Sequence, residues 1–361
     1  MSDSFKDFRV VGMAIDPIHV GTGGERLGRV ELTIVRDPVT RVPKIPGSSL
    51  AGVYRSYVAM CLEDERQRSG GGGRQQPYFP DCAGLGQPDS QGRGGHCGRS
   101  DCPVCVTFGF ARGQGGGFAG LAAFSDAHVL LFPVPTREGP LWVTSPEQLR
   151  IAEVISEVEQ LSQVTDNALY CEKDNQQPIN LGWLLLERKA LQGYNETIKE
   201  RLKNHGVPEY IRERSGVLPD RLFSHVVNSN LEVRTSVSIN PETGAAEEGA
   251  LFSYEALPRS TILVWTVTCR NPKHFKVRGN CINAQINGAT INTPEKVYEV
   301  VKKADPLLEH LGIGGMGTRG MGRLRVLNAT NTGAGAAGSA GEKTAEQAGT
   351  TVTPEKEGDQ R

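Results

Sequence analysis

Four cysteines in one glycine-rich stretch have the types and spacing of a metal site. Cys102 and Cys105 form a C-x₂-C pair, Cys97 precedes them, and Cys82 lies further upstream. Zn²⁺ takes four thiolate or imidazole ligands in a tetrahedron, and a C-x₂-C turn supplies two of them. His96 is the alternative to Cys82 as the fourth ligand. We therefore expect a structural zinc site that orders a segment without its own core, the alternative being scattered surface thiols.

A second glycine-rich run, GIGGMGTRGMGR at residues 312–323, contains two arginines. Part of it matches the dinucleotide-binding fingerprint, which should follow a strand and open a helix. This run follows a predicted helix and precedes a predicted strand, so we reject that interpretation. Glycines allow backbone amides to approach phosphates. The residues predicted to contact a nucleic-acid backbone are Gly315, Gly317, Arg319, Gly320 and Arg323, and a tight turn packed under the sheet is the alternative.

The N-terminal block places several polar groups in one short stretch. His19 precedes a glycine-rich turn, Glu31 and Arg36 follow it, and Ser48 and Ser49 precede an apolar periodic segment. The free amides at a helix N-terminus bind anions readily, so Ser48 and Ser49, together with Arg36, are predicted to contact a nucleic-acid backbone. The simpler interpretations are capping for the serines, a hydrogen-bonded strand end for His19, and a solvated position for Glu31.

The elements that must position these groups follow from hydrophobic periodicity. The order of strands and helices predicts an α+β fold with helices on one face of a sheet. Strands are predicted at 8–18, 30–35, 121–132, 141–143, 183–187, 261–268 and 323–327, helices at 49–66, 146–161, 195–204 and 293–311, and a hairpin at about 232–255. One domain is expected over 1–330, with an insertion at 67–110 that carries the zinc knuckle and a disordered tail at 331–361.

Composition excludes some classes of protein. The net charge of −1 over 361 residues argues against a uniformly basic nucleic-acid binder. No stretch approaches the roughly 18 apolar residues that span a bilayer, and no signal peptide is visible. We expect a cytoplasmic protein without a membrane partner, in which the eight cysteines are thiols or metal ligands.

Taken together, these stretches resemble the RAMP superfamily (repeat-associated mysterious proteins) of CRISPR systems, in particular the backbone subunit of type III effector complexes. Both Cmr-type and Csm-type features are present, so the subtype stays open. The stretches that carry the resemblance are His19–Gly24, Leu27–Tyr54, Cys102–Gly109, Phe124–Val134, Val233–Leu257 and Leu311–Arg325. The resemblance implies a ferredoxin-like (RRM-like) palm and a thumb β-hairpin at about 232–255. It also implies crRNA, complementary target RNA, other CRISPR effector subunits and further copies as partners.

The resemblance further implies metal-dependent cleavage of target RNA, with Mg²⁺ or Mn²⁺, at a loop aspartate. Glu31, in LGRVELTIVR, occupies that position here. Glutamate keeps the charge but is one methylene longer, and a displacement of about 1 Å can lower a rate about 10²-fold. His19, Tyr254 and Glu255 are the secondary catalytic candidates.

A second departure is Ala51, where relatives often carry lysine. Arg55, one helical turn onward, is predicted to supply the missing RNA contact. Two alternatives to a cleaving subunit remain: a crRNA-binding scaffold with the nuclease elsewhere in the complex, and a separate crRNA-processing endonuclease. The zinc insertion and the N-terminal block argue against the second.

Overall fold

The computed structural model describes residues 4–23, 30–70, 76–84, 95–111, 116–155, 161–173 and 175–328. The predicted tail at 331–361 lies outside them. The strands are β1 Phe5–Ala14, β2 Lys44–Ile45, β3 Ala122–Phe124, β4 Ala127–Val134, β5 Leu141–Thr144, β6 Ala168–Cys171, β7 Asn175–Leu181, β8 Leu184–Ala190, β9 Ser215–Val217, β10 Glu232–Ile239, β11 Ala246–Ala256, β12 Ile262–Arg270, β13 Lys276–Val277, β14 Asn280–Cys281, β15 Gln285–Ile286, β16 Ala289–Thr290 and β17 Leu324–Val326. The α-helices are α1 Gly47–Arg68, α2 Pro103–Phe108, α3 Pro146–Ile151, α4 Glu200–Asn204, α5 Glu209–Arg212, α6 Asp220–Ser229, α7 Pro294–Lys302 and α8 Asp305–Leu311.

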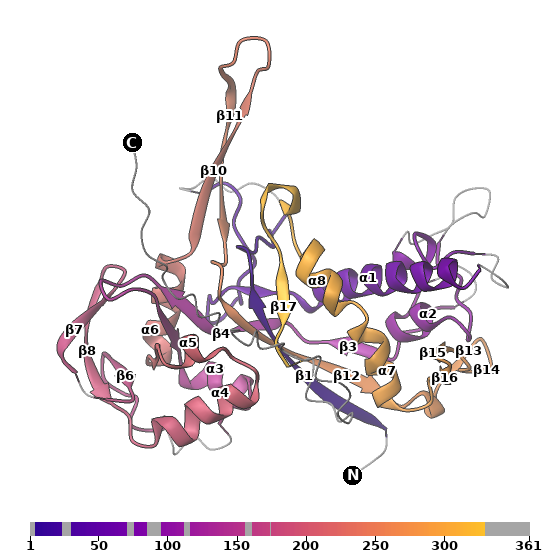
Figure 1. Cartoon of the computed structure of the whole chain (residues 1–361), viewed down its shortest axis with the longest axis horizontal. Helices are drawn as coiled ribbons and strands as arrows, with labels where there is room; N and C mark the ends of the chain where they lie inside the picture. Colours follow the sequence, from indigo (N-terminus) through magenta and orange to yellow (C-terminus); the bar gives the residue numbers. More distant parts are fainter. Residues whose placement is uncertain are drawn as a thin grey trace, which may run out of the picture. The chain divides into compact units, whose positions relative to one another are not determined.

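One large mixed sheet organises the described residues (Figure 1). Its strand order is β17-β1-β12-β4-β5-β9-β6-β8-β7, with β2 and β3 attached beside that path. Neighbouring strands among β17, β1, β12 and β4 pair antiparallel. In contrast, β5 pairs with β9, and β6 with β8, in parallel. The predicted α+β class is confirmed.

The sheet buries both of its faces. Successive side chains of a strand point to opposite faces, so Val10 and Val11 of β1 enter two different apolar clusters. The cluster around Val10 contains residues of α1, α7 and α8, and the cluster around Val11 contains residues of α3, α4 and α5. The expectation of helices on one face only was wrong, because the middle of the chain, where the pattern was weak, covers the second face.

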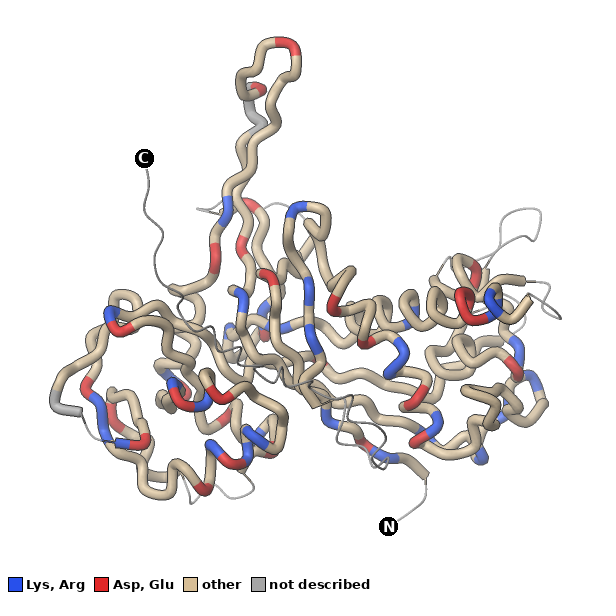
Figure 2. The backbone as a smooth tube through the Cα atoms, viewed as in Figure 1, with Lys and Arg blue, Asp and Glu red and all other residues tan. Residues whose placement is uncertain are grey.

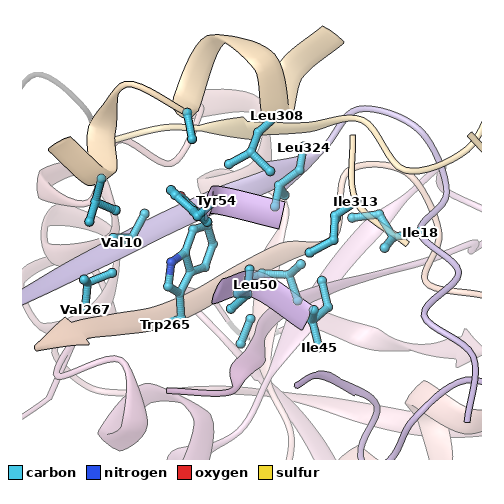
Figure 3. Close-up of a cluster of buried hydrophobic side chains, with 14 of the residues drawn as sticks. Val10, Ile18, Ile45, Leu50, Tyr54, Trp265, Val267, Leu308, Ile313 and Leu324 are labelled. Carbon is cyan, nitrogen blue, oxygen red and sulfur yellow. The ribbon is translucent and has the colours of Figure 1, made fainter. Parts of the chain in front are cut away.

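Helix α1 forms where apolar residues recur at helical spacing. Leu50, Tyr54, Val58 and Leu62 are buried along one side of it. Figure 3 shows Leu50 and Tyr54 packed beside Trp265 of β12, which is among the largest fully buried side chains. Full burial of each such side chain contributes about 1.5–3 kcal/mol. This packing fixes α1 against the sheet.

The hairpin of β10 and β11 pairs from Glu232 opposite Ala256 to Ile239 opposite Ala246, close to the predicted bounds. It extends beyond the sheet in Figure 1. Several apolar residues of the hairpin are exposed, among them Val233, Val237 and Leu251. Because apolar side chains far from a core gain nothing from exposure, this projecting hairpin is suited to contact another molecule.

Several of the predicted elements differ from the structure. The helix predicted at 146–161 ends at Ile151, and the strand predicted at 8–18 ends at Ala14. The segment at 30–35 is not a strand, because Leu32 and Ile34 bridge different partners, Tyr254 and Gly21. The strand predicted at 121–132 is divided into β3 and β4 by Ser125 and Asp126. The helix predicted at 293–311 is two helices, α7 and α8, with the break just before Pro306, which lacks a backbone donor.

A buried carboxyl group lies where α8 begins. The Tyr54 hydroxyl donates to Asp305 Oδ1 at 3.3 Å. Burial raises the pKa of Asp305 to about 7, against a hydrogen bond from Tyr54 that lowers it. A folded-state pKa above the unfolded value means that protonation favours the folded state. The stabilisation is therefore complete below pH 4 and is lost as the pH rises through 7.

We expect Asp305→Asn to remove this pH dependence, since an amide does not ionise. At pH 8 the variant should be more stable than wild type by up to about 4 kcal/mol, with the difference shrinking towards pH 4. Urea unfolding at pH 5, 6, 7 and 8 measures it, with the exposed Glu187→Gln as control. Parallel stability curves for wild type and Asp305→Asn would contradict the assignment.

Candidate functional site: a pocket at the base of the hairpin

A pocket of about 720 Å³ opens where three separate segments meet. The first is the N-terminal segment, which is bridged to the end of β11 by Ile18 and Leu257. The second is the glycine run at 312–323, which is bridged to the N-terminal segment by Gly315 and His19. The third segment is β11, which Leu32 bridges at Tyr254. The residues that line the pocket are His19, Glu31, Leu32, Phe252, Gly315, Met316, Thr318 and Arg319.

Glu31 is fixed against the hairpin by backbone contacts. Its Oε2 accepts a hydrogen bond from the backbone N–H of Ser253 at 2.9 Å. The neighbouring Leu32 donates to Ser253 O at 3.1 Å and accepts from Glu255 N at 3.0 Å. The carboxylate is therefore positioned at the pocket wall by β11, and its second oxygen accepts no hydrogen bond from the described residues.

His19 is a buried residue whose ring edge reaches the same pocket, with 6% of its surface exposed. Its Nδ1 lies 2.6 Å from the backbone oxygen of Glu255. A carbonyl oxygen only accepts, so Nδ1 must carry the proton of this hydrogen bond. In the neutral ring Nε2 is then the acceptor. Gly315 N donates to His19 O at 2.9 Å, which ties the histidine to the glycine run.

Glu255 and Tyr254, two of the predicted catalytic residues, lie behind the pocket rather than in its lining. Glu255 accepts from Arg36 Nη2 at 2.8 Å, and Arg36 Nε donates to Asn228 Oδ1 at 2.8 Å. Tyr254 is 3% exposed and its ring packs edge-on against His19, with ring centres 5.9 Å apart. Both residues, and Arg36, which was predicted to bind RNA, support the pocket walls.

The glycine run forms the opposite wall. Gly314 adopts a φ of +90°, and a Cβ there would overlap the backbone oxygen of His19. Gly315 lines the pocket, whereas Gly317 and Gly320 are exposed and a Cβ would meet little. Sequence reasoning therefore chose Gly317 and missed Gly314, because a motif spacing does not reveal which glycine lies against a neighbouring backbone.

The two arginines of the run have different surroundings. The Arg319 guanidinium lies 5.5 Å from the centre of the Phe252 ring, at the mouth of the pocket. Arg323 is paired with Asp16, donating from Nε at 2.5 Å and from Nη2 at 3.0 Å. Arg319 is thus the arginine of this run that lines the pocket.

Phe252, Leu32 and Met316 are lining residues that sequence reasoning missed. Phe252 and Tyr254 alternate along β11, and their ring centres lie 6.0 Å apart. The sequence displays this alternation in the stretch FSYE. Residues two positions apart on a strand share a face, so the candidate Tyr254 could have pointed to Phe252. With Arg319, Phe252 provides a flat surface of the type on which nucleobases stack.

Ser48 and Ser49 lie at the start of α1 but do not cap it, since the N-cap is Pro46. Instead the carboxylate of Asp126 accepts from Gly47 N at 2.8 Å, and Lys44 pairs with that carboxylate at 2.7 Å. Burial alone would raise the pKa of Asp126. The hydrogen bonds that its carboxylate accepts from Lys44 and from the Gly47 backbone outweigh burial, so the pKa is lowered. A carboxylate therefore already occupies part of this helix N-terminus.

The four predicted cysteine ligands converge. Cys82, Cys97, Cys102 and Cys105 are buried, and their Sγ atoms all lie within 4.8 Å of one another. The pairs Cys97–Cys105 and Cys82–Cys102 are 3.6 and 3.9 Å apart. Tetrahedral zinc thiolates with bonds of about 2.3 Å place sulfur atoms about 3.8 Å apart. The cluster can hold a metal ion.

His96, the alternative ligand, turns away from this cluster. Its Nδ1 lies 2.7 Å from Arg55 Nη2, while Arg55 Nε and Nη1 donate to Cys82 O and Gly109 O at 2.7 and 2.9 Å. Burial lowers the pKa of Arg55, and the charges of the four cysteines act in the opposite direction. Arg55, predicted to bind RNA, therefore links α1 to the cysteine knuckle.

The family model of the RAMP superfamily matches residues 13–325, and the chain belongs to this superfamily. Among curated proteins, it is similar to the CRISPR system Cmr endoribonuclease Cmr4 of Pyrococcus furiosus, with 26% identity over 88% of this chain and 94% of that protein.

Solved structures share the fold. A chain of the type III-B Cmr-beta complex bound to cognate target RNA covers 90% of this chain at a TM-score of 0.55 and 18% identity, with 99% of its own length aligned. Oligomeric Cmr4 from Pyrococcus furiosus gives 0.52 and 20% identity over 90% of this chain and 99% of its own. Among the described residues, no helix is long and apolar enough to cross a membrane.

Proposed function

We propose that this chain is a Cmr-type backbone subunit of a type III CRISPR effector complex that binds crRNA and cleaves complementary target RNA. The observation that carries the proposal is the pocket at the hairpin base. The Glu31 carboxylate, the buried His19, Phe252 and Arg319 all line this pocket. The similarity to Cmr4 over most of the chain supports it. The partners are crRNA, target RNA, other effector subunits and further copies, in the cytoplasm.

The architecture supports a ferredoxin-like palm. The strands β1, β4, β12 and β17, with α1 after β1 and α7 and α8 before β17, give the connectivity βαββαβ. Their order in the sheet, β17-β1-β12-β4, is the 4-1-3-2 order of that fold. We assign β10 and β11 as the thumb that contacts RNA, within one RAMP domain over residues 1–330.

The pocket residues suit attack by an RNA 2′-hydroxyl on the adjacent phosphate. His19 Nε2 accepts the hydroxyl proton, since Nδ1 is held as a donor by Glu255 O. The 2′-oxygen bonds to phosphorus as the bond to the 5′-oxygen breaks, and the departing 5′-oxygen takes a proton from water, leaving a 2′,3′-cyclic phosphate and a 5′-hydroxyl end. Glu31 orients the reacting nucleotide from the opposite wall. Phe252 and Arg319 bind an unpaired base beside it.

Mg²⁺ or Mn²⁺ fits this site with one protein ligand. Magnesium usually keeps several waters and binds through one or two carboxylates plus substrate phosphates, so a preformed cage is not required. Glu31 is the carboxylate for this ion, because its second oxygen accepts no hydrogen bond from the described residues, whereas Glu255 is paired with Arg36. A bound ion would neutralise charge that develops on the phosphate. We also assign structural zinc to the four cysteines.

The proposal is tested by adding labelled complementary RNA and Mg²⁺ or Mn²⁺ to the purified complex. We expect regularly spaced products with cyclic phosphate ends, and no cleavage where the attacking nucleotide is 2′-deoxy. Binding without cleavage would leave a scaffold subunit, as the substitution of glutamate for the family's aspartate allows. Absence of both binding and cleavage would contradict the whole assignment.

A matched pair of glycine variants tests whether cleavage depends on the glycine that lies against the His19 backbone or on the glycine chosen from the motif spacing. We expect Gly314→Ala to lower cleavage by about 10²-fold or more, because the new Cβ displaces the His19 backbone and moves the ring. Gly317→Ala should leave the rate within about twofold, since its Cβ meets only Leu311 O at 4.0 Å. Single-turnover rates with saturating enzyme measure both. Equal rates for the two variants would show that His19 does not depend on this wall.

A further inference from the structure

A second pocket, of about 390 Å³, lies in a part of the chain to which the proposed function assigns no chemistry. It is formed where β5 and β9 begin and β6 ends, with Arg188 of β8 beside them. Lys199 enters from a π-helical turn at Asn195–Lys199. Such turns are rare and frequently occur at functional sites.

The deepest charged groups of this pocket are cations. The Lys199 and Arg188 side chains are 8% and 10% exposed. Their carboxylate partners lie nearer to solvent: Glu138 is 48% exposed, Glu213 is 53% and Glu172 is 34%. Figure 2 shows both signs of charge interleaved around β6–β8.

Arg188 has an incomplete set of hydrogen bonds. Its Nη2 donates to Glu138, whereas its buried Nε has no hydrogen-bond partner among the residues that the structure describes. Nε and Nη2 form the edge of the guanidinium that binds two oxygens of one oxyanion side-on. Lys199 Nζ, held between Glu172 and Glu213 at 2.7 Å each, supplies a second cation in the same pocket.

We propose that this pocket is an oxyanion-binding site that takes a phosphate group, with Arg188 and Lys199 as its ligands. The phosphate replaces Glu138 at the Nε–Nη2 edge of Arg188 and replaces one of the two glutamates at Lys199. The three glutamates are a third to a half exposed, so their carboxylates can turn out into solvent when the phosphate enters. The pocket volume accommodates a group as large as a nucleotide.

The test is titration of the purified full-length protein with inorganic phosphate, adenosine monophosphate, and a short RNA with and without a 5′-phosphate. We expect saturable binding by calorimetry, weakened at least about tenfold in Arg188→Gln and Lys199→Gln. Glu138→Gln should bind about threefold or more tightly, because it removes the competing charge. A purely structural ion-pair network predicts no such gain.

Arg150→Gln is the matched control, since Arg150 pairs with Glu147 on the surface, outside the pocket. Tighter binding of the RNA with a 5′-phosphate than of the same RNA without it, with the difference lost in Arg188→Gln, identifies an RNA end as the source. Equal binding of the two RNAs, with saturable binding of inorganic phosphate or adenosine monophosphate, identifies a free ligand. No saturable binding of any probe, or equal binding by wild type and Arg188→Gln, overturns the proposal.

Discussion

Glu31→Ala is expected to lower the rate of target RNA cleavage by about 10²–10³-fold while RNA affinity changes little. The carboxylate lies in the lining of the hairpin-base pocket, and its Oε2 is already held by Ser253 N at 2.9 Å. The second oxygen, which no described residue binds, is the one that would orient the reacting nucleotide or a divalent ion. The loss should therefore fall on the chemical step.

Two further substitutions separate charge from position. Glu31→Gln keeps an oxygen that can accept from Ser253 N but loses the charge, so it should be nearly as slow as alanine. Glu31→Asp keeps the charge on a shorter side chain and should retain partial activity. Single-turnover cleavage and filter binding give rate and affinity separately, with the exposed Glu187→Ala, outside the hairpin and the pocket, as control. Wild-type cleavage by Glu31→Ala would move catalysis to another residue or subunit.

Removing one cysteine of the cluster is expected to have the largest effect on stability. Cys105→Ser leaves three thiolates and should reduce bound zinc from about one equivalent to a small fraction. Because the four thiolates join Cys82 and Cys97 to α2, losing the metal removes this cross-link, and we expect the free energy of unfolding to fall by about 4 kcal/mol or more. Zinc by mass spectrometry and thermal unfolding, each with and without chelator, measure the two effects.

Cys281→Ser is the matched control, because Cys281 is an exposed cysteine outside the cluster. It should keep both the metal and the melting temperature of wild type. A wild-type protein that purifies folded and free of zinc would refute the structural zinc assignment. Zinc loss without any loss of stability would show that the ion does not hold the knuckle in place.

The positions closest in sequence were the easiest to predict. The pair Cys102 and Cys105 is set by local spacing, and α1 follows from apolar residues at helical intervals, both of which a sequence displays directly. The strand at 30–35 was wrongly predicted because β-propensity describes a segment's fit to neighbours, and here each bridge has a different partner.

The sequence by itself determined the cysteine knuckle, the α+β class, the hairpin at 232–255 and the group of candidate residues around His19 and Glu31. Only the tertiary structure decided which of these share a pocket. Glu31, His19, Arg319 and Phe252 line the pocket. Glu255 and Arg36 pair behind the pocket lining, and Arg55 donates to the cysteine knuckle. The contacts of Glu31 with Ser253 and of Arg36 with Glu255 join residues more than two hundred positions apart, and Arg55 contacts Cys82 across 27 positions. They depend on sheet register and burial, which no local pattern of residues records.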